Sequence, residues 1–468
     1  MKTTTTTLFL AATAALTSAV ATPARIEARA SGTSSTLPTV TVKGNAFFAG
    51  DKRFYVRGID YQPGGSSGAS GSTGASDPIA NVENCKRDIV EFKKLGINTV
   101  RVYTVDNTLN HDECMSALAD AGIYLALDVN TPKYSIRRDK PAQSYNAVYL
   151  QSLFATVDAF QGYSNTLLFF SGNEVINDDT STPCAPYVKA VTRDLKQYIG
   201  SRGYRKIPVG YSAADVESNR YEMADYMNCG TDDQRSDFYA FNDYSWCDPS
   251  TYEVAWQPKV EKFGNYSLPL FLSEFGCIKG TRTFDGQIAA LMSSQMTSVY
   301  SGGLAYEYSE EGSGYGLVTL SGSSVSEGSS FRALQSQFSS NPAPQGDGGY
   351  KMGGAASECP AQSSTWEVKD FTGGALPAIP DGAQDYMKNG AGTGPGLAGS
   401  GSQDAGGQST ATASAGSGSV TAVASGGAAS ATQSGAAGSP RAGGAMGMAP
   451  WVCAAVVVCS TMFGAALL

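Results

Sequence analysis

The feature that most constrains the fold is a regular alternation of short apolar runs with amphipathic stretches through the middle of the chain. The apolar runs are rich in aromatic and β-branched residues and are bounded by Gly, Pro or polar residues, which is typical of buried strands. Stretches with a helical spacing of apolar residues fill the intervals. The expected strands are 54–61, 99–105, 124–129, 167–173, 207–213, 238–244, 268–275 and 302–309.

The intervening helical patterns decide between fold classes. In the first of them, Ile89, Phe92 and Leu95 recur at helical spacing and Gly96 follows as a stop signal. Eight strands that alternate with helices predict an α/β fold, the (β/α)8 barrel. An open doubly wound sheet is the alternative, but no Gly-x-Gly-x-x-Gly pattern follows the first strand to support a dinucleotide fold. The expected helices are 82–95, 112–121, 146–161, 185–200 and 285–300.

Two glutamates stand at the carboxyl ends of expected strands, where barrel enzymes carry their functional side chains. Glu174 follows the apolar run 167–173, and Glu274 lies near the end of the run 268–275. A buried carboxylate is costly unless it is paired or hydrogen-bonded, so either one alone could be a structural ion pair. Together, on the fourth and seventh strands, they predict a catalytic pair. One carboxyl can protonate a glycosidic oxygen while the other attacks or activates water.

Aromatic residues at the strand ends support a carbohydrate ligand. Sugar rings pack their C–H faces on aromatic planes, and phenol hydroxyls bond sugar hydroxyls. For any single tyrosine, core packing is an equally good explanation, so the group is more informative than its members. The group comprises Tyr61, Tyr103, Tyr244, Trp246, Tyr306, Tyr308 and Tyr315.

Other chemistries find less support. The single histidine, His111, precedes an expected helix and is interpreted as a surface or capping residue. It is the only base available to a Ser-His-Asp triad, and no Gly-x-Ser-x-Gly elbow is present. One histidine also excludes a zinc site with several histidine ligands, whereas an oxygen-ligand Ca²⁺ site stays open. No cofactor or metal is expected. A net charge of -9 without a basic stripe argues against nucleic acid as a partner.

Both ends of the sequence carry targeting signals. A positive start, an apolar run at 8–20 and the small residues 19–21 predict a secretory signal peptide. The apolar, uncharged segment 446–468 follows a small-residue stretch that begins at Ser434, which predicts glycosylphosphatidylinositol (GPI) attachment near Ser434 and removal of the tail. A transmembrane helix is the alternative for this tail. We therefore expect secretion and GPI anchoring to the outer face of the plasma membrane, the cell wall, or both.

The segment before this tail is dominated by Gly, Ala, Ser and Thr, with Asp404 as the only charge in 389–433. Such a composition buries too little apolar surface to offset chain entropy, so a flexible stalk is expected. The expected parts are a signal peptide (1–21), an N-terminal linker (22–37), the catalytic barrel (38–340), an extension (341–388), the stalk (389–433) and the attachment signal (434–468).

Nine cysteines are present, of which Cys453 and Cys459 would leave with the tail. Seven remain in what is expected to be an oxidising compartment, so most should be paired and one left over. Asn265 begins the one glycosylation sequon, Asn-Tyr-Ser.

Several motifs in the same order resemble those of the fungal β-1,3-glucanosyltransferases of glycoside hydrolase family 72. The resemblance covers about residues 38–340 and extends to the anchor architecture. The motifs are RGIDYQPGG (57–65), RVY (101–103), LDVNTP (127–132), FSGNEV (170–175), NDYSWC (242–247), LSEFGC (272–277) and YEYSEE (306–311).

The resemblance implies a retaining mechanism, with Glu174 as acid/base and Glu274 as nucleophile. Asn173 matches the residue that bonds the sugar 2-hydroxyl, and Tyr244 matches a residue that contacts the nucleophile. The full set of expected substrate-binding residues is Gln62, Tyr103, Asp128, Asn173, Asp215, Tyr244 and Tyr306.

The implied reaction cleaves a β-1,3-glucan internally and transfers the new reducing end to the non-reducing end of another glucan. The partners are therefore donor and acceptor glucan, together with the membrane through the lipid, and we expect a monomer. The resemblance also implies the disulfides Cys85–Cys114, Cys229–Cys359 and Cys247–Cys277, which leaves Cys184 without a partner. The cysteine-rich glucan-binding module of some family members is absent, because only Cys359 lies between residue 340 and the tail.

Two rival functions stay open. A glucanase or mannanase of the same barrel clan would hydrolyse rather than transfer, because water always competes with the acceptor. A non-catalytic wall protein would bind glucan and use the anchor for display, although the presence of both glutamates argues against it.

Overall fold

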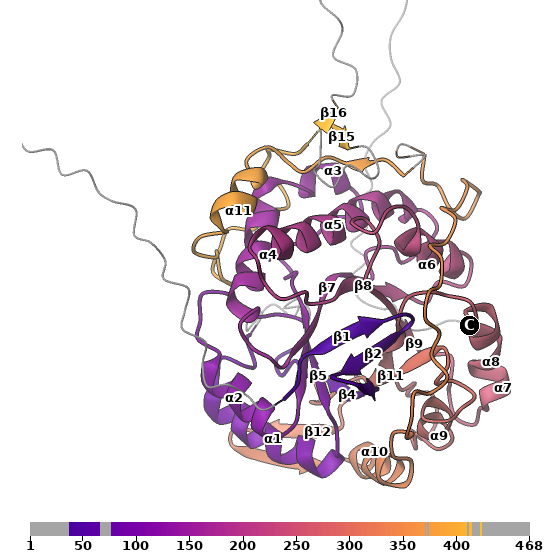
Figure 1. Ribbon diagram of the computed structural model, residues 1–468. Coiled ribbons are helices and arrows are strands. Elements are labelled where there is room, and N and C mark those ends of the chain that lie inside the picture. The colour runs from indigo at the N-terminus through magenta and orange to yellow at the C-terminus, as the bar shows by residue number, and fades with distance from the viewer. Residues whose placement is uncertain are drawn as a thin grey trace, which may run out of the picture. The chain divides into compact units, whose positions relative to one another are not determined.

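A closed parallel barrel forms the centre of the computed structural model, which describes residues 37–65, 76–369, 371, 374–409, 411–413 and 422–423. Its strands neighbour one another in the order β10-β11-β4-β5-β6-β7-β8-β9, so the sheet has no edge. The prediction of a (β/α)8 barrel is confirmed (Figure 1). The barrel strands are β4 (Val56–Asp60), β5 (Thr99–Val102), β6 (Tyr124–Asp128), β7 (Thr166–Asn173), β8 (Val209–Ala214), β9 (Phe238–Asp243), β10 (Leu270–Phe275) and β11 (Tyr300–Ala305).

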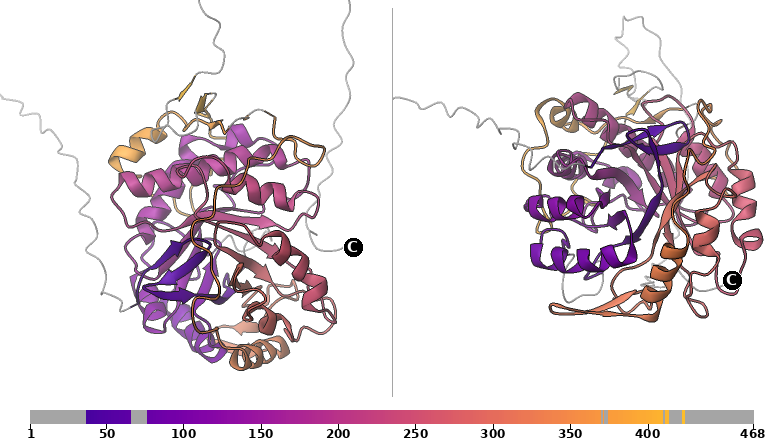
Figure 2. Two further views of the ribbon diagram at one scale, coloured as in Figure 1. Left: turned by 45° about the vertical axis from the view of Figure 1, so that its right-hand side comes forward. Right: turned by 60° about the horizontal axis from the view of Figure 1, so that its bottom comes forward.

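Helices surround the barrel, as the views of Figures 1 and 2 show. The bounds of α1 match the predicted 82–95 because both of its caps are local: the Asn81 side chain accepts from the Asn84 amide, and Gly96 ends the helix in the left-handed region at φ 70°. The helices are α1 (Val82–Leu95), α2 (Asp112–Asp120), α3 (Pro141–Ser144), α4 (Ala147–Phe160), η1 (Thr182–Cys184), α5 (Ala185–Ser201), α6 (Arg220–Asn228), α7 (Tyr252–Ala255), α8 (Gln257–Lys262), α9 (Gln287–Leu291), α10 (Ser329–Ser340) and α11 (Ala383–Asn389).

An N-terminal antiparallel sheet, not foreseen as strands, packs against one end of the barrel. It comprises β1 (Val40–Lys43), β2 (Ala46–Ala49) and β3 (Lys52–Phe54). Phe47 from this sheet packs with its ring centroid 6.1 Å from that of Phe238 and 5.9 Å from that of Phe271. The same buried cluster includes Phe170. Because the amino-terminal end of the barrel is filled in this way, the opposite end is the one left for a site.

The predicted helix 285–300 is largely wrong. Only 287–291 is helical, as α9. The cause lies in Ser293, whose hydroxyl donates to the Ala290 carbonyl at 2.7 Å and accepts from the Gln295 amide at 3.2 Å. A serine that bonds neighbouring backbone groups competes with the helical ladder, which favours a turn here.

The predicted start of the stalk at residue 389 also needs correction, and the extension before it is more ordered than expected. Residues 341–388 include α11 and β14 (Leu376–Pro377), and a small sheet continues through β15 (Thr412–Ala413) and β16 (Ala422–Val423). Asp404 forms an ion pair with Arg137 at 3.1 Å. Composition predicts how the segment behaves alone, whereas the barrel supplies partners that composition does not reveal. Residues 424–433, the attachment signal and the signal peptide lie outside the described residues.

Three disulfides tie the chain together, in the pairings that the resemblance implied: Cys85–Cys114, Cys229–Cys359 and Cys247–Cys277. Cys184 is a buried free cysteine, and burial raises the pKa of its thiol to about 11.

Asn265 is exposed, as a glycan acceptor must be. No helix in the described part of the chain is long and apolar enough to cross a membrane. Two further strands, β12 (Val318–Ser321) and β13 (Ser324–Glu327), form a hairpin before α10.

Candidate active site

Glu274 lies near the carboxyl end of β10 and is held by three donors. The hydroxyl of Tyr103 donates to its Oε1 at 2.8 Å, that of Tyr244 to its Oε2 at 2.7 Å, and Arg101 Nη1 lies 3.4 Å from Oε1. The residue is 7% exposed. Burial raises the pKa of Glu274 to about 7, Arg101 and the two phenols oppose the rise, and the charge of Glu174 adds to it. Donors fix both oxygens and favour the ionised form, which suits a nucleophile.

Glu174 follows β7 directly and has a different environment. Its main-chain amide donates to the Ser212 carbonyl on β8 at 2.9 Å, and its φ of 47° lies in the left-handed region. A non-glycine residue in that region costs about 1–3 kcal/mol, and such residues cluster at functional sites. The Oε1 atom accepts from Asn242 Nδ2 at 2.8 Å. Among the described residues no cation is bonded to the Glu174 carboxyl group, so a neutral amide supports it where a guanidinium and two phenols support Glu274.

Arg101 bonds the side chains of Glu274, Asp128 and Asn173. The sequence analysis did not assign this role to it. It is fully buried and forms a two-pronged pair with Asp128, with Nε 2.9 Å from Oδ2 and Nη2 3.2 Å from Oδ1. Its guanidinium also lies over the rings of Tyr103 and Phe170, 4.2 and 4.4 Å from their centroids. A fixed, always-charged fork of this kind can serve several acceptors at once. An arginine at the end of an otherwise apolar strand is the signal that could have identified it.

A further carboxyl group, that of Asp60, lies at the end of β4. It is completely buried, and its nearest cationic atom is Arg101 Nη1 at 4.0 Å. Neither of its oxygens has a hydrogen-bond partner among the described residues. Burial raises the pKa of Asp60 well above its usual range, while the charge of Arg101 opposes the rise.

Asn173, the last residue of β7, is oriented by bonds to its carbonyl oxygen. Its Oδ1 accepts from Arg101 Nη2 at 3.0 Å, from the Ser212 hydroxyl at 2.7 Å and from Asn242 Nδ2 at 3.3 Å. The side-chain oxygen is therefore occupied, and the amide nitrogen is the group it can offer as a donor. This orientation agrees with a bond to a sugar 2-hydroxyl.

The remaining predicted contact residues differ in what they touch. Gln62 bonds main chain at both ends of its amide: Oε1 accepts from the Tyr103 and Thr104 amides at 3.1 and 3.0 Å, and Nε2 donates to the Ser76 carbonyl at 2.7 Å. It therefore braces the end of β5. The carboxylate of Asp215 is bound by Lys259 Nζ at 2.7 Å and by Arg220.

The aromatic group divides into site and core. Tyr306 packs edge-on against Tyr103, Tyr244 and Tyr315, with ring centroids 5.3–6.5 Å away, so these four rings lie together beside Glu274. The other three are packing residues. The hydroxyls of Tyr61 and Tyr308 both bond the buried Asp88, at 2.8 and 2.7 Å, and Trp246 packs on Trp256.

His111 occupies the N-cap position of α2, as one of the two interpretations predicted, but it is not a surface residue. It is 1% exposed, and its Nε2 lies 2.7 Å from Asp77 Oδ2. No side-chain hydrogen bond from it caps α2. The same carboxylate also accepts from the Asp106 amide at 2.8 Å, which explains the burial of both partners as a structural pair. No group of three or more metal-ligating side chains occurs in the described ranges.

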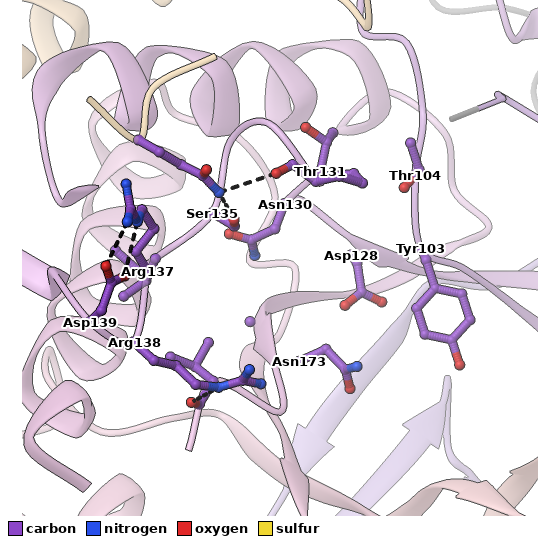
Figure 3. Close-up of a pocket in the computed structure, with 15 residues that line it drawn as sticks. Tyr103, Thr104, Asp128, Asn130, Thr131, Ser135, Arg137, Arg138, Asp139 and Asn173 are labelled. Carbon is purple, nitrogen blue, oxygen red and sulfur yellow. Dashed lines mark hydrogen bonds and ion pairs between the residues drawn. The ribbon is translucent and has the colours of Figure 1, made fainter. Parts of the chain in front are cut away.

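A pocket of about 620 Å³ adjoins the site: Asn173 and Val175, the chain neighbours of Glu174, line it, and so does Tyr103, which bonds Glu274. Tyr103, Asp128 and Asn173 line it where it meets the site (Figure 3). Arg138 also lines the pocket, and its guanidinium donates to the main-chain carbonyl of Glu174 at 2.5 Å. The volume lies within the range of about 300–1,000 Å³ that is usual for ligand sites.

Comparison with known proteins gives one consistent result. A family model described as Glucanosyltransferase, of glycoside hydrolase family 72, matches residues 29–342. The 1,3-beta-glucanosyltransferase gel1 of Aspergillus fumigatus is 63% identical over 77% of this chain and 78% of its own length. The 1,3-beta-glucanosyltransferase GAS5 of Saccharomyces cerevisiae is 49% identical over 81% and 77%. A crystal structure of a Saccharomyces cerevisiae Gas2p variant with laminaritetraose and laminaripentaose has a TM-score of 0.65 and 36% identity, and the match covers 71% of this chain and 75% of that one.

Proposed function

The chain belongs to the glucanosyltransferase family, glycoside hydrolase family 72, and from this premise we propose that Glu174 and Glu274 elongate β-1,3-glucan by a double displacement. The protein is a 1,3-β-glucanosyltransferase. It cleaves one β-1,3-glucan chain internally and transfers the new reducing end to the non-reducing end of another. Its substrates are neutral polymers, which the acidic surface does not repel.

The first displacement breaks the donor chain. The Glu274 carboxylate attacks the anomeric carbon of the sugar at the cleavage point, and the bond from that carbon to the glycosidic oxygen breaks. Glu174 gives its proton to the departing oxygen, so the released fragment leaves with a free hydroxyl. The retained fragment is then an ester on Glu274, while Tyr103 and Tyr244 bond the carboxyl oxygens. The amide nitrogen of Asn173 bonds the 2-hydroxyl, an interaction that strengthens in the transition state.

The second displacement rebuilds the same linkage on another chain. The 3-hydroxyl at the non-reducing end of the acceptor attacks the anomeric carbon and gives its proton to Glu174, and Glu274 departs as a carboxylate. Two inversions at one carbon retain the β configuration. Transfer prevails over hydrolysis because a bound acceptor hydroxyl has an effective concentration far above that of a freely diffusing one. The rings of Tyr244, Tyr306 and Tyr315 beside Glu274 are suited to hold that acceptor sugar.

The observation that carries the assignment of nucleophile and acid/base is that the two carboxyl groups accept hydrogen bonds from different sets of donors. Glu274 has three donors that include a guanidinium, whereas Glu174 accepts from the Asn242 amide. The test is to incubate the protein with a reduced laminari-oligosaccharide and to measure the chain lengths of the products. Products longer than the donor are expected. If only shorter products form, the protein is a glucanase, and the transfer assignment fails.

We also propose that the protein is exported and held at the cell surface by a GPI lipid. Three disulfides support a compartment outside the reducing cytosol. Release of the protein from intact cells by a phosphatidylinositol-specific phospholipase is the expected result. Retention after this treatment, together with extraction by detergent, would indicate a spanning tail instead.

A further inference from the structure

Residues 391–409, here termed the clasp, lie against the loops at the mouth of the barrel although their composition is that of a linker. The clasp meets the loop after β5, where the Gly396 and Leu397 amides donate to Asn107 Oδ1 and Asp106 Oδ2 at 3.0 and 3.1 Å. At its start, the Ala391 amide donates to the Tyr198 hydroxyl at 2.9 Å. These are contacts between main chain and specific side chains, so the clasp has a defined path over the barrel.

The clasp also meets the loop after β6. Lys133 Nζ donates to the Leu397 and Gly399 carbonyls at 3.0 and 3.1 Å, and the Ser402 amide donates to the Lys133 carbonyl at 3.0 Å. Asn146 Nδ2 donates to the Ser402 carbonyl at 2.7 Å, and Ser402 is fully buried. Both of the loops that it contacts follow the carboxyl ends of barrel strands, where the site lies.

The glycines of the clasp are required by close approach. A β-carbon at Gly394 would lie 2.1 Å from Asn107 Oδ1, and one at Gly399 would lie 2.2 Å from the Tyr134 hydroxyl. A side chain at either position requires a shift of Asn107, of Tyr134 or of the clasp itself. The glycines therefore do more than lower the apolar content, because they let the main chain lie directly on polar groups of the barrel.

One side chain of the clasp reaches the pocket that adjoins the site. Gln403 lines that pocket together with Asp128 and Asn173. Its Nε2 donates to the Pro132 carbonyl at 3.2 Å and to the Ser135 hydroxyl at 2.9 Å. Both N–H bonds of the amide are thereby used, and the carbonyl oxygen is the group that it can offer to a ligand hydroxyl.

The pocket wall contains two buried polar atoms that lack partners within the described part of the chain. They are Thr104 Oγ1 and Asn130 Nδ2, and both residues line the pocket. Thr104 is 1% exposed. Neighbouring protein atoms cover both of these atoms, so they lie behind the pocket surface and a ligand reaches them only if those neighbours shift. A sugar ring carries both donors and acceptors, so one of its hydroxyls can donate to the Gln403 carbonyl oxygen at the pocket surface.

We propose that the clasp completes a glucose-binding subsite at the outer end of this pocket, with Gln403 as its specificity-determining residue. The proposal rests on the function given above, because the ligand is the same glucan chain. The inner wall of the subsite holds Thr104 and Asn130, and the clasp supplies the outer wall. Only a chain long enough to extend from the glutamates to Gln403 gains from this contact.

The test compares variants of the full chain on reduced laminari-oligosaccharides of increasing length. Gln403→Ala removes the side chain, and Gly399→Val lifts the clasp without changing Gln403. For both variants, we expect the ratio of kcat/KM for long donors to that for short donors to fall about fivefold, equivalent to one hydrogen bond of ~1 kcal/mol. Gln408→Ala is the matched control, because Gln408 lies in the same segment, is exposed and does not line the pocket.

Three outcomes separate the claims. If the length ratio is unchanged in Gln403→Ala and Gly399→Val, or falls equally in Gln408→Ala, the subsite proposal is overturned. A loss that is equal at all lengths also overturns it, because a general defect in folding or catalysis has no dependence on chain length. If the unaltered protein yields no products longer than the donor, the transfer function itself fails, whatever the variants do.

Discussion

Replacement of Glu274 by glutamine should make the protein more stable above neutral pH while it abolishes activity. The substitution keeps the shape of the side chain and removes its charge. Burial raises the pKa of Glu274 from 4.5 to about 7 in the folded protein, so ionisation of this group is harder in the folded than in the unfolded chain. That rise corresponds to a ceiling of about 3 kcal/mol. The group is 7% exposed, so solvent screening reduces this figure little.

The sign of the pH dependence follows from proton uptake. Below about pH 4.5 the carboxyl is protonated in both states and the raised pKa has no cost. As pH rises from about 4.5 to about 7, the unfolded chain loses this proton first, and the wild type loses stability relative to Glu274→Gln. Above about pH 7 the difference reaches its full value and stays constant.

Thermal or denaturant unfolding of both proteins between pH 4 and 8 measures this difference directly. Glu217→Gln serves as the control, because it makes the same chemical change at an exposed position. The reasoning about Glu274 is refuted if the variant gains nothing in stability between pH 4.5 and 7, or if it becomes less stable than the wild type as pH rises.

Three smaller predictions concern the same site and its surroundings. Tyr244→Phe removes a donor that favours ionised Glu274, so the acidic limb of the pH profile of kcat/KM should move to higher pH, whereas an unmoved limb would contradict this role. Asn242→Ala removes the donor to Glu174 and should lower kcat about 10- to 100-fold, as measured by single-turnover kinetics; an unchanged kcat would show that Glu174 needs no such support. Cys184→Ala should leave transfer activity intact. In the unaltered protein a thiol reagent should label Cys184 only after denaturation, because burial raises the pKa of the thiol to about 11. Rapid labelling of the folded protein would argue against this burial.

The barrel could be predicted from sequence because its signals are local. Each strand is an apolar run with polar residues at its end, and α1 has its start and stop in Asn81 and Gly96. The sheet β1–β3 was missed, because its strands are short and their purpose is to fill the barrel end through distant contacts such as Phe47 with Phe271. The helix expected over 285–300 failed at Ser293, whose side chain bonds the backbone of its own turn.

The site was predictable in its reacting groups and less so in what supports them. Glu174 and Glu274 are visible as charges beside apolar strands. The roles of Arg101 and Asn242 depend on which neighbours the closed barrel brings to them, and one strand read alone does not contain that information. The same limit explains the clasp: its composition predicts disorder, while the polar groups that fix it, such as Lys133, lie about 260 residues earlier in the chain.

The most direct test of the central claim is to identify the residue that becomes glycosylated. Glu174→Gln should react with a laminaribiosyl fluoride, since fluoride departs without protonation, and the ester should accumulate because no base activates the acceptor. Peptide mass spectrometry is expected to find one laminaribiosyl mass on the peptide that contains Glu274, and none when Glu274→Gln is added. Fluoride release without an adduct on Glu274, or an adduct on another side chain, would contradict the double displacement at this residue.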